Sequence, residues 1–590
     1  MCGILGLINF SDRPVAPEGL KAMSATMIDR GPDGAGIYTQ GRLGFGHRRL
    51  KVIDLTQSSQ QPMVDSQLGL GIVFNGAIYN YKELRKELEQ KGYTFFSHGD
   101  TETILKAYHA WGEQFIHRLN GMFAFAIWER DSERVLLARD RLGIKPLYYS
   151  ESSTQFRFAS TLPALLAGGG VSTDIDPIAL HHYLMFHAVV PAPYTLLAGV
   201  RKLEPGTMMV IEPTGERRHH AYWQLSFDPR EDEKNLTEQD WEDRVYNGLR
   251  TAVRRRLVAD VSVGVLLSGG LDSSLIVGLL AAEGATGLNT FSIGFETVEE
   301  EKGDEFFYSD IIAKEFSTQH HKLPVDSNNV LPNLLNCIHA MSEPMVSHDA
   351  IGFYLLSKEV SKHVTVVQSG QGADEIFAGY HWYPPMLNSH NPVMDYRNVF
   401  FDREQEEFCR VVHSRFHQED HSQRFVEKHF SQPGASRAID QALRLDTTIM
   451  LVDDPVKRVD NMTMAWSLEA RVPFLDHEVV ELAARVPAEM KIAQGGKGIL
   501  KEVARRVIPH EVIDRPKGYF PVPALKYLRG PYWEMVQDAL SSKASQHREL
   551  CQQAYVDELL ERPDDHITPL RGSKLWQLGL LELWLQSHQI

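Results

Sequence analysis

The sequence predicts two domains: an α+β domain of stacked sheets, then an α/β domain with a doubly wound parallel sheet and a helical C-terminal part. Its 590 residues suffice for two to four domains, and 43% hydrophobic and 23% charged residues are typical of globular proteins. The pattern changes once, at the polar, acidic segment 229–243. Strand-like runs dominate before this segment, and strands alternate with helices after it. We therefore expect domains at residues 2–215 and 235–590.

The first domain is rich in short apolar runs that are separated by glycine-rich turns. Runs typical of strands lie at residues 3–10, 70–76, 122–128 and 134–140. Helical patterns lie at residues 81–90 and 101–111. This combination predicts stacked sheets that are flanked by helices.

The second domain alternates strand and helix patterns. Strands are expected at residues 261–267, 290–295 and 364–370, and helices at residues 273–284 and 309–316. Such alternation is typical of a parallel, doubly wound sheet. From about residue 440 the pattern is mainly helical.

Composition excludes several classes of function. The formal net charge of −16 disfavours binding to nucleic acid, and the run Arg254–Arg256 is interpreted as a solvated helix face. No apolar run reaches the roughly 18 residues of a membrane span. The four cysteines are far apart, with no C-x-x-C pair for zinc and no disulfide framework. The N-terminus has no pattern of a secretory signal, so we expect a cytoplasmic protein.

Cys2 is a candidate nucleophile because a small second residue allows Met1 to be removed. Cys2 would then carry a free α-amine, and an α-amine pKa of about 7.7–8.0 suits a general base near neutrality. A thiol with a pKa of about 8.5 is only partly ionised and benefits from such a base. By position alone, Cys2 would be an ordinary second residue.

The surroundings of Cys2 favour the catalytic interpretation. Six ordered segments resemble the class II glutamine amidotransferases, whose catalytic domain is an N-terminal-nucleophile hydrolase with an αββα sandwich. These segments are residues 1–4, 29–34, 46–50, 74–80, 98–102 and 139–149. The resemblance implies that the Cys2 thiol attacks the glutamine side-chain amide and releases ammonia.

The same resemblance assigns the other residues of the glutamine site. Asn75 and Gly76 match the oxyanion hole, Arg49 matches the residue that binds the glutamine α-carboxylate, and Asp100 matches the residue that binds its α-ammonium. A structural alternative exists, because Asn-Gly also favours a type I′ turn.

A second motif, residues 268–274, follows the buried strand 261–267 and precedes a helix. Its glycines let backbone N–H groups face an anion, and the helix N-terminus adds its dipole. The chain has no Walker motif. It therefore lacks the lysine with which that motif binds the γ-phosphate that is transferred. Helix capping by Ser and Asp could explain two of these residues but not the whole run.

This loop resembles the pyrophosphate loop of ATP-dependent adenylating enzymes, which form AMP and pyrophosphate. Residues 291–295, 369–380 and 467–476, together with Lys497, resemble the synthetase domain of the glutamine-hydrolysing asparagine synthetases. The resemblance implies that Asp272 and Asp374 bind Mg²⁺ and that Lys497 is a catalytic residue facing the pyrophosphate. The implied ATP-binding residues are Leu266, Ser268, Gly269, Gly270, Asp272, Ser273, Ser274, Ile293, Ser369 and Gly370.

Two half-reactions follow from these resemblances. Cys2 would hydrolyse glutamine, and the second domain would use ATP and Mg²⁺ to adenylate an acceptor carboxylate that ammonia then attacks. The two chemistries imply a shielded channel between the domains. One alternative is a glutaminase without ATP chemistry, which the intact loop 268–274 disfavours. Another is a catalytically silent binding protein, which the presence of Cys2 and Asp272 disfavours. The sequence does not fix the oligomeric state, and a homodimer is one option.

The acceptor site is expected to include Gln371 and Asp374. Asparagine synthetases usually carry an acidic residue where this chain has Gln371, and a carboxamide lacks the basicity of a carboxylate. Together with residues 109–113 and 298–310, this departure resembles the N-acetylglutaminylglutamine amidotransferases. These enzymes amidate the C-terminal carboxylate of an acetylated glutamine dipeptide, an osmoprotectant precursor. Plain asparagine synthesis from aspartate is the alternative, in which Gln371 is a neutral replacement.

Three histidine pairs could suggest a metal site. They are His181 with His182, His219 with His220, and His320 with His321. None has an i, i+4 partner and a carboxylate in a recognisable ligand pattern. We therefore interpret them as surface or packing residues.

Overall fold

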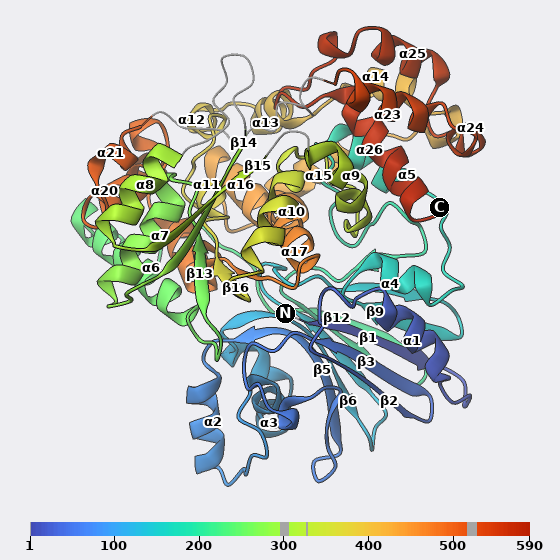
Figure 1. Ribbon diagram of the computed structural model, residues 1–590, viewed down its shortest axis with the longest axis vertical. Helices are drawn as coiled ribbons and strands as arrows, with labels where there is room; N and C mark the ends of the chain where they lie inside the picture. The colour runs from blue at the N-terminus through green and yellow to red at the C-terminus, as the bar shows by residue number, and fades with distance from the viewer. Residues whose placement is uncertain (1, 296–305, 326–328, 516–527) are drawn as a thin grey trace.

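The computed structural model describes residues 2–295, 306–325, 329–515 and 528–590. Residues 298–305 of the segment 298–310, which supports the resemblance to the dipeptide enzymes, lie outside the described residues. Figure 1 shows two layered β-sheets at the bottom of the molecule and a third sheet above them, with the C-terminal helices at the upper right.

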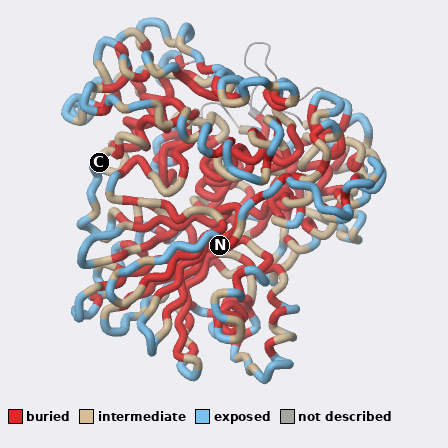
Figure 2. The backbone as a smooth tube through the Cα atoms, turned by 180° about the vertical axis from the view of Figure 1, so that it is seen from behind, coloured by how far each residue is buried: buried red, intermediate tan, exposed pale blue. Residues whose placement is uncertain are grey.

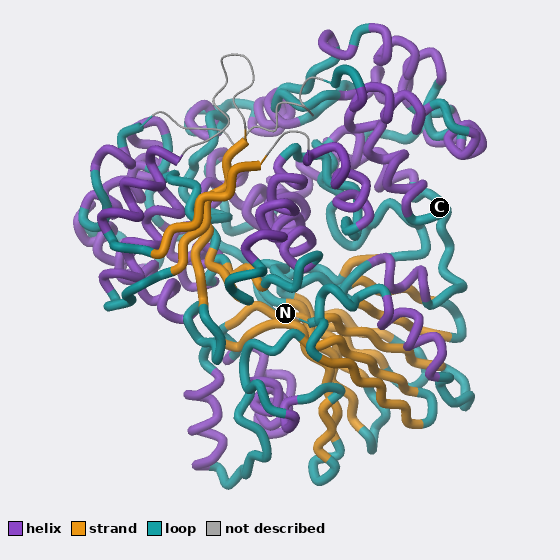
Figure 3. The backbone as a smooth tube through the Cα atoms, in the orientation of Figure 1, coloured by secondary structure: helices purple, strands orange, loops and turns teal. Residues whose placement is uncertain are grey.

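The N-terminal domain contains two six-stranded sheets, which Figure 3 shows as stacked orange layers. In the first, the strand order is β10-β8-β9-β1-β3-β2, and in the second it is β12-β11-β7-β6-β5-β4. The first comprises β1 (Gly3–Asn9), β2 (Gly34–Gln40), β3 (Leu43–Arg49), β8 (Tyr148–Glu151), β9 (Gln155–Ala159) and β10 (Arg201–Lys202). The second comprises β4 (Met63–Asp65), β5 (Leu70–Ile78), β6 (Gly121–Glu129), β7 (Val135–Arg139), β11 (Thr207–Ile211) and β12 (Arg217–Ala221).

Helices cover the outer faces of the two sheets and complete an αββα sandwich. Helices α1 (Pro17–Ala25) and α4 (Leu162–Ala167) pack on the first sheet, and α2 (Tyr81–Gln90) and α3 (Asp100–Trp111) pack on the second. Between the sheets lies an apolar core that includes Ile4, Phe45 and Phe156. Figure 2 shows the resulting burial of the strands in red.

The second domain contains a five-stranded parallel sheet with the order β15-β14-β13-β16-β17. Its strands are β13 (Val263–Leu266), β14 (Asn289–Phe295), β15 (Gln319–Val325), β16 (Val366–Gln368) and β17 (Glu469–Arg471). In chain order this is 3-2-1-4-5, so the direction of winding reverses between β13 and β16. Ligands of such sheets bind beyond the carboxyl ends of the strands at this switch point.

Helices flank both faces of this sheet, as in a doubly wound domain. Figure 1 shows α6 (Glu238–Arg255), α7 (Leu271–Ala282) and α8 (Phe306–Glu315) on one side, and α10 (Asp349–Val360) and α17 (Lys457–Met464) on the other. The other described α-helices between β15 and α17 are α9 (Val330–His339), α11 (Ala373–Ile376), α12 (Tyr383–Met386), α13 (Pro392–Phe400), α14 (Gln405–Val411), α15 (His421–Phe430) and α16 (Ala438–Leu445).

The chain after β17 is helical, as expected. Its helices are α18 (His477–Arg485), α19 (Ala488–Ile492), α20 (Gly498–Arg505), α21 (His510–Ile513), α23 (Pro531–Leu540), α24 (Lys543–Arg548), α25 (Gln553–Glu561) and α26 (Lys574–Ser587). The helix α5 (Pro177–Met185) of the first half contacts α14 and α15. One apolar core accordingly extends from the first sheet into the second domain.

Buried ion pairs also join the two domains. Asp460 of α17 accepts from the guanidinium of Arg30 at 2.9 Å and lies 3.3 Å from the Lys145 ammonium. Lys202 lies 2.5 Å from Asp453, and all five groups are buried. Because an unpaired charge is costly in such surroundings, these pairs favour one relative arrangement of the domains.

The predicted fold class is confirmed, and the structure adds detail that the sequence did not give. The second sheet extends to Ala221 through the pairing of β12 with β11. The interpretation of Arg254–Arg256 as a solvated face is wrong for Arg256, which is buried and lies 2.8 Å from Asp476. Among the described residues, none of the helices has the length and apolar character that crossing a bilayer requires.

Candidate active sites

Cys2 immediately precedes β1 and lies among the N-terminal strands. Its backbone N donates to Asn75 Oδ1 at 3.0 Å, and its Sγ lies 3.8 Å from the carbonyl oxygen of Leu50. Burial raises the pKa of the Cys2 thiol above its usual value. A buried thiol of this kind needs a nearby base to become a nucleophile, and its own α-amine would be the nearest one after removal of Met1.

Asn75 and Gly76 lie within β5, so the type I′ turn alternative is wrong. Asn75 is fully buried, and its Nδ2 is without a hydrogen-bond partner among the described residues. A buried amide N–H without a partner is costly and suits an oxyanion that appears only during reaction. At position 76, a Cβ would lie 2.1 Å from the carbonyl oxygen of Met122, so only glycine fits there.

Arg49 is buried at the end of β3, where backbone carbonyls hold its guanidinium. Nη1 donates to the carbonyl of Thr56 at 2.7 Å, and Nη2 donates to the carbonyl of Asp54. Both acceptors belong to residues 50–56, which we call the 50–56 loop. The fork geometry of the guanidinium is thereby fixed by this loop, as bidentate recognition of a carboxylate requires.

Asp100 begins α3 and is buried beside the same site. Its Oδ2 accepts from the backbone N of Ile78, three residues after Asn75, at 3.0 Å. Burial raises the pKa of Asp100 to about 7. An incoming ammonium would stabilise the charged carboxylate, which fits the role that the resemblance assigns to Asp100.

Asp54 was not predicted as a site residue, yet it connects the parts of the predicted glutamine site. Its carboxylate accepts from Ser59 Oγ at 2.5 Å, from Thr56 Oγ1 at 2.6 Å and from the backbone N of His98 at 2.8 Å. Burial alone would raise its pKa, but these donors outweigh that effect and lower it. Through its own carbonyl and through His98, Asp54 links Arg49 to the start of α3, where Asp100 lies.

The predicted nucleotide loop lies where β13 ends and α7 begins, at the switch point of the parallel sheet. Ser268 Oγ lies 3.1 Å from Ser273 Oγ and accepts from the backbone N of Gly270 at 3.3 Å. Gly269 has a φ of 77°, which favours glycine. The loop therefore turns tightly at the N-terminus of α7, as an anion site does.

The second predicted segment meets this loop from β16. A Cβ at Gly370 would lie 3.0 Å from Cβ of Asp272 and 3.1 Å from the backbone N of Ser273, so the two segments pack closely. Ser369 is buried and donates its backbone N to the carbonyl of Arg471. Of the residues expected to line the adenylate, Leu266 and Ile293 are also buried at the ends of β13 and β14.

Lys497 lies between the two carboxylates that the resemblance assigns to Mg²⁺. Its Nζ is 2.7 Å from Asp272 Oδ2 and 2.9 Å from Asp374 Oδ2. Burial alone would lower the pKa of Lys497, but the two carboxylates outweigh burial and raise it. The three predicted residues come from distant positions in the chain, and the structure brings them together. Gly379 permits this approach, because a Cβ there would lie 2.4 Å from Lys497 Cε.

Gln371 is half-buried and begins the turn between β16 and α11. The following residue, Gly372, has a φ of 94°, and a Cβ there would lie 2.4 Å from Leu475. Glu375, which was not predicted, is buried and accepts from Tyr380 OH at 2.8 Å. Burial raises the pKa of Glu375 to about 7.

Arg515 is a third residue that the sequence interpretation missed. A Cβ at Gly270 would lie 3.7 Å from Arg515 Nη2, so the guanidinium is close to the predicted nucleotide loop. Its Cζ also lies 4.4 Å from the centre of the Tyr308 ring. Only its place in the fold, and no local motif, identifies it.

The three histidine pairs lie on α5, β12 and β15. His181 and His182 are buried. Nδ1 of each ring lies 3.0–3.1 Å from Ser422 Oγ, which is within hydrogen-bond distance. Such contacts are typical of packing residues. Burial lowers the pKa of His182 to about 3, which keeps it neutral. In the part of the chain that the structure describes, no three His, Cys, Asp or Glu side chains are grouped as metal ligands.

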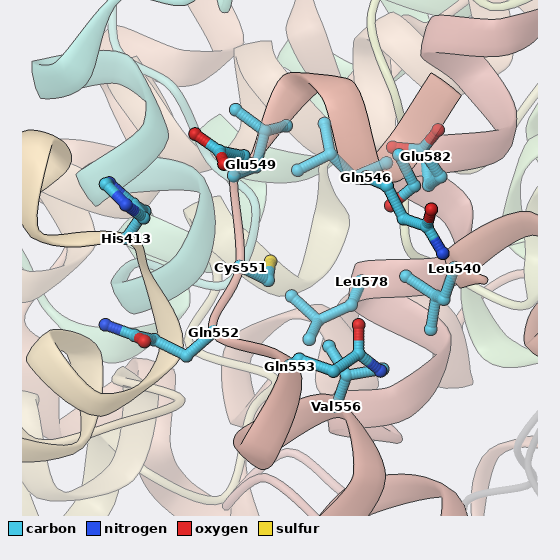
Figure 4. A pocket seen from close by; sticks show the side chains of 13 residues that line it. His413, Leu540, Gln546, Glu549, Cys551, Gln552, Gln553, Val556, Leu578 and Glu582 are labelled. Carbon is cyan, nitrogen blue, oxygen red and sulfur yellow. The ribbon is translucent and has the colours of Figure 1, made fainter. Parts of the chain in front are cut away.

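A cavity of about 250 Å³ lies in the C-terminal helical part, away from every predicted site residue. Figure 4 shows Gln546, Gln552 and Gln553 around it, with Leu578 and Cys551 among the other lining side chains. Burial raises the pKa of Cys551 to about 12, so this thiol is un-ionised. None of the predicted site residues lines this cavity.

The fold and the comparisons define a two-domain glutamine amidotransferase. Residues 1–223 match the family model described as glutamine amidotransferase domain, and residues 244–586 match the model described as asparagine synthase. The chain belongs to the asparagine synthase family. It is a glutamine-dependent amidoligase of the asparagine synthetase type.

Relatives match along nearly the whole chain. Glutamine-hydrolyzing asparagine synthetase 1 of Bacillus subtilis (strain 168) is 33% identical over 99% of this chain and 96% of its own. Glutamine-hydrolyzing asparagine synthetase 3 of the same organism is 29% identical over 100% of this chain and 99% of its own. Amidase chry2 of Gibberella zeae is 25% identical over 92% of both chains. Relatives with different names thus match nearly the full length of this chain.

Proposed function

We propose that this enzyme transfers ammonia from glutamine to the adenylated C-terminal carboxylate of N-acetylglutaminylglutamine. The observation that carries the choice of acceptor is Gln371, a carboxamide where an acidic residue is usual in the resembled asparagine synthetases. A carboxamide has no basicity to offer, but it donates and accepts hydrogen bonds, as the amide groups of a dipeptide do. The acetylated dipeptide would be the osmoprotectant precursor, and its amide would be the product. The alternative acceptor is aspartate, because two of the relatives are asparagine synthetases by name.

In the first half-reaction, Cys2 is the nucleophile. The thiol attacks the glutamine carboxamide carbon, and its proton passes to the α-amine that removal of Met1 exposes. Asn75 Nδ2 and the N–H of Gly76 stabilise the oxyanion of the tetrahedral intermediate. Collapse to a thioester expels ammonia, which takes up the proton it needs from the α-ammonium; water then hydrolyses the thioester to glutamate. Arg49 and Asp100 hold the α-carboxylate and α-ammonium of the substrate.

In the second half-reaction, the acceptor carboxylate attacks the α-phosphorus of ATP. The P–O bond to the pyrophosphate breaks, and Lys497 with the loop around Ser268 and Ser273 stabilises the leaving charge. Ammonia then attacks the acyl carbon, AMP leaves, and a surplus proton is released. A shielded interdomain path would deliver the ammonia unprotonated.

Mg²⁺ is compatible with the residues present. Asp272 and Asp374 supply oxygen donors and already share one cation, the Lys497 ammonium. Mg²⁺ commonly uses one or two carboxylates together with substrate phosphates, and its bound charge would neutralise those phosphates. The two carboxylates are therefore the proposed ligands.

The deciding experiment is competition between the two acceptors. We expect kcat/KM for the acetylated dipeptide to exceed that for aspartate by at least about tenfold, because contacts with the amide groups are missing in aspartate. Both kcat/KM values are measured from AMP formation, with glutamine as donor, and product mass identifies the acceptor that was amidated. Gln371→Glu is expected to lower dipeptide amidation; a clear preference of the parent enzyme for aspartate would refute this acceptor.

The pH dependence of glutamine use tests the role of Asp100. Its raised pKa of about 7 means that the free carboxyl loses its charge as the pH falls below 7. Protonated Asp100 cannot pair with the α-ammonium, so kcat/KM for glutamine should fall by up to about tenfold per pH unit below 7. In Asp100→Asn the value should be low and this titration should be missing from the profile. A limb near pH 7 that persists unchanged in the variant would contradict the assignment.

Location and assembly are secondary parts of the proposal. All four cysteines are free thiols, which is consistent with a reducing cytoplasm. A homodimer is the proposed assembly, and light scattering at micromolar concentration tests it.

A further inference from the structure

The 50–56 loop of the glutamine site is held by a residue of the other domain. Asp260 lies three residues before β13 and belongs to the synthetase domain. Its carboxylate Oδ2 accepts from the backbone N of Asp54 at 2.7 Å. Its backbone N donates to the carbonyl of Val52 at 2.8 Å. Two hydrogen bonds in opposite directions therefore join this short segment to the loop.

The 50–56 loop carries the acceptors on which the glutamine site depends. The carbonyls of Asp54 and Thr56 receive both terminal nitrogens of Arg49, and the carbonyl of Leu50 lies 3.8 Å from the Cys2 thiol. Asp54 has a φ of 49°, a conformation that L residues adopt only when surrounding contacts maintain it. A bond to its backbone N–H is such a contact.

Other contacts of Asp54 explain why its exact position matters. Its carboxylate reaches the backbone N of His98, two residues before Asp100. A Cβ at Gly99 would lie 2.7 Å from Ser59 Oγ and 3.4 Å from Asp54 Cβ, so the loop and the start of α3 are in close contact. A shift of Asp54 would therefore move both Arg49, proposed to bind the α-carboxylate of glutamine, and Asp100, proposed to bind its α-ammonium.

We propose that Asp260 is a positioning residue through which the synthetase domain completes the glutamine-binding site. This inference rests on the proposed glutaminase function of Cys2. Asp260 touches neither substrate nor reacting atom; it fixes the backbone of Asp54, which fixes the guanidinium of Arg49. Glutamine binding, rather than the chemistry at the thiol, is the step that depends on it.

The test compares Asp260→Ala with Asp260→Asn in the full-length enzyme. In the alanine variant, we expect KM for glutamine to rise about three- to tenfold with kcat for glutamate release within twofold of the parent. The asparagine variant should restore the parental KM, because its side-chain oxygen can accept from the same N–H. Synthesis from free ammonia should be unchanged in both variants. Asp131→Ala, at an exposed turn of the first domain, is the matched control.

The possible outcomes separate this inference from the proposed function. An unchanged glutamine KM in Asp260→Ala, in a parent that hydrolyses glutamine, would overturn the inference alone. An equal loss of glutamine-dependent and ammonia-dependent synthesis would assign Asp260 a merely structural role and also overturn it. A parent enzyme without glutamine hydrolysis would overturn the proposed function and this inference with it.

Discussion

Cys2→Ala is expected to abolish glutamine-dependent synthesis while leaving synthesis from free ammonia at the parental rate. The substitution removes the proposed nucleophile, and loss of a nucleophile lowers kcat by at least about a thousandfold. All residues of the proposed synthetase site, including Asp272 and Lys497, are unchanged in this variant. Glutamate release and AMP formation, measured with glutamine and then with ammonium chloride, give the two rates.

Two controls make this result specific. Cys409→Ala removes a half-buried thiol from α14 and should change neither rate. The intact mass of active enzyme should correspond to a chain without Met1, because only then does Cys2 carry an α-amine. Glutaminase turnover that survives in pure Cys2→Ala, or full activity with Met1 retained, would refute the nucleophile and its base respectively.

Sequence patterns predicted the elements whose burial is set by near neighbours. The apolar runs at 70–76 and 122–128 are strands β5 and β6, which pair along their length, and the pattern at 81–90 is α2. Alternation of strand and helix likewise predicted the parallel sheet. Such elements can be predicted from sequence because each must have one or two apolar faces where it packs, and these faces appear as a periodic pattern of apolar residues.

The remaining parts of the sites depend on contacts that no local pattern contains. Asp54 and Asp260 are 206 positions apart, and neither residue type nor spacing distinguishes them from surface aspartates. Arg256 was expected in solvent because arginine is seldom buried, but Asp476 on a distant segment pairs with it. Such pairs become visible only when the fold brings the chain segments together.

Sequence motifs predicted Lys497 as a site residue but did not predict its contacts. The motif identified Lys497, Asp272 and Asp374 one by one, yet their mutual distances of 2.7–2.9 Å follow from the approach of α20 to α7 and α11. The Lys497 ammonium pairs with both carboxylates and offsets their mutual repulsion. Removing one negative charge therefore alters the position of the lysine as well as the ligands available to a metal.

Asp272→Asn is accordingly expected to lower adenylation by at least about a hundredfold and to leave glutamine hydrolysis intact. The asparagine side chain keeps the shape of the loop, but its amide nitrogen presents N–H donors to the Lys497 ammonium where a carboxylate oxygen lay 3.0 Å or less away. One of the two proposed Mg²⁺ ligands is lost as well. The rate of AMP formation with saturating acceptor and ammonia measures the effect without requiring the glutaminase site.

A matched substitution, Asp557→Asn on the exposed face of α25, should leave AMP formation at the parental rate, because it changes the same charge far from β13. Glutamate release should be equal in both variants and in the parent, which shows that each protein is folded. AMP formation at the parental rate in Asp272→Asn would refute the assignment of the 268–274 loop. Formation of ADP by the parent would do the same, because breaking the α–β bond of ATP is what this loop, Lys497 and the two carboxylates are proposed to promote together.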